Sequence, residues 1–94
     1  MNAQELTLNI AVNLGRIGRW ACEGKRERLE QFMKETEEFI AELAKAPKSA
    51  KFQKTFDAFL ITFSSLKKNV RLDPVWAEMM FTWANILTHR ARLA

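Results

Sequence analysis

Apolar side chains recur every three or four positions through most of this chain, which is the spacing of one face of an α-helix. The clearest stretch is residues 25–45. At about 100° per residue its apolar residues form a single stripe: Leu29, Phe32, Met33, Phe39, Ile40 and Leu43. Charged residues such as Arg26 and Glu30 pair at i,i+4 on the opposite face, and Pro47 blocks continuation. The pattern predicts an amphipathic helix over 25–45.

Two further helices are predicted in the C-terminal half. Residues 49–69 place phenylalanine and leucine on one face, and Ser49 is a suitable N-cap. Residues 74–92 follow Asp73 as N-cap and begin with Pro74, whose missing N–H is harmless at the first helical position. The last helix is predicted to share one apolar face among Val75, Trp76, Met79, Met80, Trp83, Ile86 and Leu87.

The N-terminal segment fits two patterns. Its apolar residues alternate at the period of a strand: Leu6, Leu8, Ile10, Val12 and Leu14. A helical stripe fits equally, through Leu6, Ile10, Leu14, Ile17 and Ala21. No other segment reads as a strand, and a lone strand leaves its backbone hydrogen bonds unmade. We therefore predict a helix over residues 4–22.

The joint near Gly24 decides the architecture. The apolar stripe changes phase between Ala21 and Leu29, so Gly24 either ends one helix or lies inside a long helix of about 40 residues, roughly 60 Å. We favour the first, because four helices of similar length form a compact bundle. The prediction is a single all-α domain over residues 1–94, an antiparallel four-helix bundle. The alternative has three helices, one of them long.

Composition limits the setting of the protein. The chain is 48% hydrophobic and 28% charged, which is typical of a globular domain. Its only cysteine, Cys22, excludes an intrachain disulfide and favours a reducing, cytoplasmic location. The longest apolar run, residues 58–61, is far shorter than the ~20 residues that span a bilayer. We expect no membrane segment.

No residue pattern indicates catalysis. His89 has no carboxylate, thiolate or second histidine one turn away, and no local base accompanies Cys22. The glutamates of 23–42 read as a solvated, salt-paired face rather than a metal site. We expect a non-enzymatic protein with no metal, no cofactor and no small-molecule substrate. No motif is specific enough to indicate a family.

Basic residues suggest one kind of binding. The net charge is +4, and residues 79–94 contain no acid. The candidate anion contacts gather at the first helical junction and at the start of the third helix: Arg16, Arg19, Arg26, Arg28, Lys48, Lys51 and Lys54. They favour nucleic acid or another polyanion as an alternative function, without any known nucleic-acid-binding signature.

Apolar residues off the main stripes suggest a different kind of binding. Four large ones lie away from the predicted core faces: Leu8, Val12, Ile61 and Phe81. A bundle this small has few interior faces, so we interpret these residues as contacts with a partner. The leading hypothesis is a helical interaction module, acting as a homodimer or as a subunit of a larger assembly.

Overall fold

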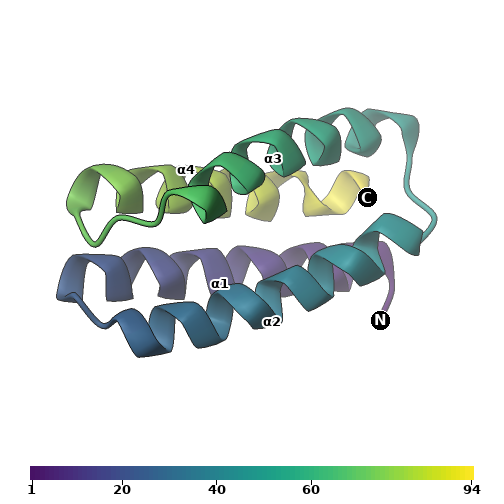
Figure 1. The fold of residues 1–94 in the computed structure, drawn as a ribbon. Helices are drawn as coiled ribbons and strands as arrows, with labels where there is room; N and C mark the ends of the chain where they lie inside the picture. The colour runs from purple at the N-terminus through teal and green to yellow at the C-terminus, as the bar shows by residue number, and fades with distance from the viewer.

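A computed structural model describes all 94 residues, which form four α-helices and a short 3₁₀ turn, with no strand. The elements are α1 (Ala3–Glu23), α2 (Arg26–Lys45), α3 (Ala50–Lys68), α4 (Pro74–Arg90) and η1 (Ala91–Leu93). Consecutive helices run antiparallel, and both termini lie at the same end of the bundle (Figure 1). The predicted all-α four-helix fold is confirmed, and each helix end lies within two residues of its prediction. None of the helices has the length and apolar character needed to cross a membrane.

Gly24 forms the turn between α1 and α2. Its φ of 71° lies in the left-handed region, which glycine adopts without a steric penalty. The Gly24 N–H donates to the Ala21 carbonyl at 3.2 Å, and the Lys25 N–H donates to the Trp20 carbonyl at 2.9 Å. This is the hydrogen-bonded glycine C-cap that ends many helices. The hairpin is therefore confirmed, and the alternative of one long N-terminal helix is wrong.

Side-chain caps begin three of the helices. The Ser49 hydroxyl accepts from the Phe52 N–H at 3.1 Å, and the Asp73 carboxylate accepts from the Trp76 N–H at 2.8 Å. Both predicted N-caps are confirmed. Asn2, which the sequence pattern did not single out, caps α1 in the same way. Each cap satisfies a backbone N–H that has no partner within its own helix.

A glycine lets α1 and α4 approach closely. Small buried residues recur along α1 at helical spacing (Ala3, Thr7, Ala11 and Gly18), and Gly18 lies directly against α4. The Phe81 ring of α4 occupies the space beside Gly18, where a Cβ would lie 2.6 Å from ring atom Cε1. Phe81 is thus half-buried within the monomer, packed against the core. Phe81 projects from a different side of α4 than Met79 and Trp83 because its ring contacts α1.

Aromatic rings fill the space beneath α3. Its four buried phenylalanines are Phe52, Phe56, Phe59 and Phe63. The Phe59 ring centroid lies 5.5 Å from that of Trp83 in α4, and the two planes are tilted by 53°. These large side chains hold the α3 backbone farther from its neighbours than α1 lies from α4. The core is therefore tight along α1–α4 and aromatic beneath α3.

The predicted apolar face of α4 needs a correction. Trp76, Met80 and Leu87 are buried as expected. Val75, however, is 71% exposed and Met79 is also exposed. The reason is that α4 packs with α1 on the side that carries Phe81, whereas Val75 and Met79 project from other sides of the helix toward solvent.

Candidate interaction surfaces

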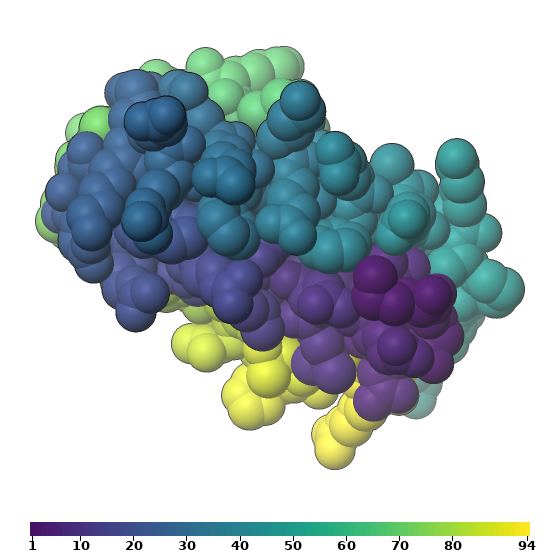
Figure 2. Space-filling view, turned by 90° about the horizontal axis from the view of Figure 1, so that it is seen from below, coloured from purple at the N-terminus to yellow at the C-terminus, as the bar shows by residue number.

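One side of α1 faces solvent along its whole length. We call it the α1 stripe and define it by five exposed residues that follow at intervals of three or four: Glu5, Leu8, Val12, Arg16 and Arg19. In Figure 2 the purple surface of α1 runs between α2 and the yellow C-terminal segment. Leu8 and Val12 are 38% and 53% exposed. The stripe has an acid at its start, apolar residues in the middle and two arginines toward its end.

A hollow of about 420 Å³ opens beside the α1 stripe, between α1 and α4. It is lined by Val12, Gly15, Arg16, Arg19 and Phe81. Gly15 forms part of its floor, and a Cβ built there would meet nothing within 4 Å. The hollow therefore has apolar walls and an arginine rim, and it lies open to solvent.

Three of the four predicted partner residues lie in this region. Val12 and Phe81 line the hollow, and Leu8 lies one turn before Val12. Ile61 does not belong with them: it is 76% exposed on α3 and does not line the hollow. The exposed pair Val75 and Met79 was missed, because the helical pattern places both in the core.

The arginines near the first turn contact aromatic rings or acids of their own chain. The Arg16 guanidinium lies 5.5 Å from the Phe32 ring, and that of Arg28 lies 5.9 Å from the Trp20 ring. Arg26 pairs with Glu30 at 3.5 Å, and Arg19 lies 3.9 Å from Glu23. The two ion pairs are exposed and add little stability, and all four arginines remain accessible to solvent.

Lys48 has an internal role. Its ammonium donates to the carbonyl oxygens of Leu43 at 2.6 Å, Ala46 at 2.8 Å and Ala44 at 3.2 Å. It also lies 5.3 Å from the Phe56 ring. A cation at the C-terminal end of α2 interacts favourably with the negative end of the helix dipole and so stabilises the helix. Its donors are therefore largely engaged within the protein.

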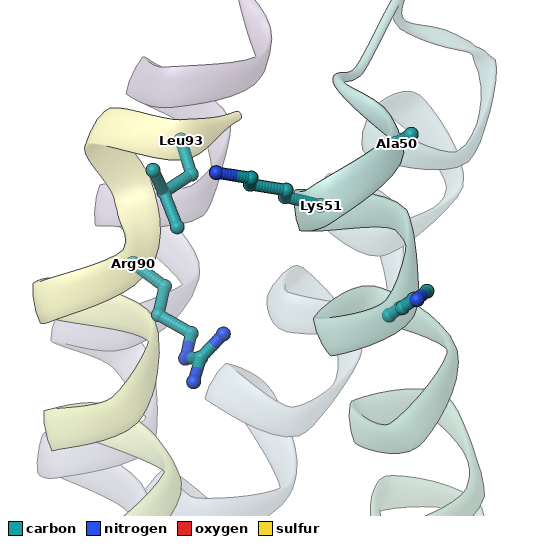
Figure 3. A pocket seen from close by; sticks show the side chains of 5 residues that line it. Ala50, Lys51, Arg90 and Leu93 are labelled. Carbon is teal, nitrogen blue, oxygen red and sulfur yellow. The ribbon is translucent and has the colours of Figure 1, made fainter.

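Lys51 and Lys54 meet a cation that the predicted set omitted. With Ala50, Arg90 and Leu93 they line a hollow of about 280 Å³ between α3 and the end of α4. The Lys51 and Arg90 side chains reach toward this space from opposite sides (Figure 3). Arg90 is 36 positions beyond Lys54 in the sequence, so only the antiparallel pairing of α3 with α4 joins them.

The predicted basic residues fall into two groups at opposite ends of the bundle. Arg19, Arg26 and Arg28 lie near the α1–α2 turn, whereas Lys48 and Lys51 lie at the end that holds both termini (Figure 1). The structure does not gather them on one continuous surface.

Reactive side chains are dispersed. Cys22 is a free, exposed thiol, and His89 is exposed in the last turn of α4. No three histidine, cysteine or acidic side chains lie close enough together to hold a metal ion. Glu38 and Glu42 point to solvent on α2, and Glu37 pairs with Lys67 of α3 at 2.9 Å. The notable surfaces are therefore the α1 stripe and the cationic hollow.

Comparison with known proteins gives no relative: no protein family, no curated protein and no solved structure matches this chain.

Proposed function

We propose that this protein is a non-enzymatic interaction module that forms a homodimer through the α1 stripe. The single observation that carries the proposal is the order of residues along the stripe. When two copies of α1 lie antiparallel with a two-fold axis at Val12, the α1 stripe of one copy is complementary to the α1 stripe of the other. Such an isologous contact is the commonest form of self-association.

The charges support this register. Glu5 and Arg19 are each seven residues from Val12, so Glu5 of one copy lies opposite Arg19 of the other. The dimer would contain two such pairs. Within one chain Glu5 forms no ion pair, and Arg19 has only an exposed contact with Glu23 at 3.9 Å, so both charges remain accessible to a partner. Opposite charges at matching positions favour one orientation over its alternatives.

The shape of the surface supports the same register. Leu8 and Arg16 are each four residues from Val12, so Leu8 of one copy lies against Arg16 of the other, beside Gly15. There Leu8 meets the hollow that Gly15 leaves open in front of Phe81. The aliphatic stem of Arg16 covers apolar surface while its guanidinium stays in water. Val12 meets its own copy at the centre.

A contact between two single helices is small. Interfaces at the low end of the size range are transient, so we expect a dissociation constant that is roughly micromolar or weaker. We place this dimer in a reducing, cytoplasmic setting, which an exposed unpaired thiol such as Cys22 favours. In the proposed register the two Cys22 thiols lie at opposite ends of the contact, so dimerisation needs no disulfide.

Sedimentation velocity over a range of concentrations tests the proposal. We expect a reversible monomer–dimer equilibrium for the wild type and a monomer for Val12→Asp, because two aspartates would face each other at the axis. Ile61→Asp is the matched control: it places the same charge on an exposed apolar position of α3 and should dimerise like the wild type. A monomer at every concentration, or a dimer that Val12→Asp leaves intact, would contradict the proposal.

Charge reversal tests the register. Glu5→Arg and Arg19→Glu should each weaken the dimer, because each variant sets like charges opposite one another. The double variant restores both pairs and should regain most of the affinity. If the two changes are simply additive, Glu5 and Arg19 do not face each other.

A further inference from the structure

The hollow between α3 and α4 is lined by three cations and by no acid. Lys51 and Lys54 come from residues 43–56, which contain no carboxylate, and Arg90 comes from the acid-free residues 79–94. The next acid along α3, Asp57, lies one turn after Lys54, where its carboxylate accepts from the Gln53 amide at 2.8 Å. None of the three forms an ion pair within the protein. Three unpaired cations around one concave space create a positive potential that favours an anion.

The two sides of this hollow are tied together. The Arg90 Nη1 donates to the hydroxyl of Thr55, a buried residue, at 3.2 Å. One turn farther along, the Ser49 hydroxyl donates to the Leu93 carbonyl. These bonds join the start of α3 to the end of α4 and η1. The cations are thus displayed on elements that are already held in place, which lowers the entropy lost on binding.

The hollow continues into an apolar groove. Lys54 and Arg90 also border a second hollow between the same two helices, with Ala58, Trp83 and Ile86 as further walls. Trp83 is half-buried, and its ring packs against Phe59 in the core. A half-buried indole held in place by Phe59 and lying next to two cations offers an apolar wall against which a flat apolar group can pack.

We propose that this groove binds a phosphate monoester that carries an aromatic or other apolar group. The phosphoryl oxygens lie among Lys51, Lys54 and Arg90, and the apolar part lies along Trp83 and Ile86. A phosphate monoester is close to dianionic at neutral pH, so it satisfies several cations at once. The guanidinium of Arg90 retains donors beyond the one that Thr55 accepts, and it matches phosphate geometry.

Calorimetric titration with phenyl phosphate and with inorganic phosphate, at matched ionic strength, tests the proposal. We expect saturable binding of phenyl phosphate, about tenfold tighter than inorganic phosphate because the ring is partly removed from water. Equal affinities would overturn the apolar half of the site. Absence of saturable binding by phenyl phosphate would overturn the proposal as a whole.

Charge-neutralising variants locate the site. Lys54→Gln and Arg90→Gln should each weaken phenyl phosphate binding about tenfold, since each removes a charge-assisted hydrogen bond. The matched controls are Lys68→Gln at the far end of α3 and Arg92→Gln in η1, which remove the same charge outside the hollow and should bind like the wild type. Because Arg90→Gln also removes the bond to Thr55, Lys54→Gln provides an independent test. Equal losses in variants and controls would show attraction by net charge alone and overturn the proposal.

Discussion

Three glycines show how single residues determine this molecule. Gly24 adopts a positive φ that ends α1, Gly18 makes room for the Phe81 ring, and Gly15 leaves the hollow beside the α1 stripe open. Of these, only Gly24 was singled out from the sequence, because its position between two apolar stripes gives a local signal. The roles of Gly15 and Gly18 depend on what α4 places nearby, which no local pattern contains.

The two helical glycines should respond to alanine with opposite signs. Gly18→Ala sets a Cβ 2.6 Å from the Phe81 ring, and the overpacking outweighs the gain in helix propensity, for a net loss of about 1 kcal/mol. Gly15→Ala meets open space and should raise the stability by about 0.5–1 kcal/mol. Urea unfolding followed by circular dichroism, at concentrations where the protein is monomeric, measures both.

A companion substitution separates sterics from helix propensity. In a Phe81→Leu background the ring is absent, so Gly18→Ala should lose most of its penalty. If Gly18→Ala is as stabilising as Gly15→Ala in the wild-type background, the close approach of α1 and α4 is wrong.

At the scale of whole helices, most of the fold could be predicted. Helix ends depend on local chemistry, and the caps at Ser49, Gly24 and Asp73 were each readable from residue type and position. Which side of α4 is buried could not be predicted from the sequence. Apolar residues surround much of that helix, so the side that meets solvent depends on where α1 and α3 lie. The sequence pattern therefore predicts Val75 and Met79 in the core, although both are exposed.

At the end of α2, the structure gives Lys48 a different role from the one that the sequence predicts. The basic cluster at the start of the third helix predicts that Lys48 binds an anion, whereas its ammonium donates to three carbonyls of its own chain. Lys48→Met keeps the apolar stem beside Phe56 but removes the donors, so we expect a loss of about 1–2 kcal/mol in unfolding free energy. Lys45→Met is the control, because it removes a charge from the same helix end where the ammonium makes no such bonds. Equal losses would indicate that the helix dipole alone accounts for the effect of Lys48.

At the scale of the whole molecule, the candidate sites could not be predicted because each one combines residues from two different helices. The cationic hollow needs Arg90 beside Lys54, and the hollow on α1 needs Phe81 beside Gly15; both pairs come from helices far apart in the sequence. Sequence reasoning identified Lys51, Lys54, Leu8 and Val12 individually, since charge and off-stripe position are local properties. It could not combine them, because the combination is set by which helices are neighbours.

The same tertiary arrangement makes α3 dependent on its aromatic side chains. The α3 backbone stands off from its neighbours, so its attachment relies on side chains such as Phe59, which is 1% exposed and contacts both Phe63 and Trp83. Phe59→Ala should lower the free energy of unfolding by about 3–5 kcal/mol. Domains of this kind have only about 5–15 kcal/mol in total, so the midpoint of urea unfolding should fall steeply.

Ile61→Ala is the matched control two residues further along the same helix. Its side chain is 76% exposed, so its truncation should change stability by less than about 0.5 kcal/mol. A single cooperative transition in Phe59→Ala would show that α3 unfolds with the rest of the bundle, whereas an early loss of part of the helical signal would show that α3 separates first. If Phe59→Ala and Ile61→Ala have the same effect, α3 does not pack through its phenylalanines, and the groove that it forms with Trp83 and Arg90 would not exist.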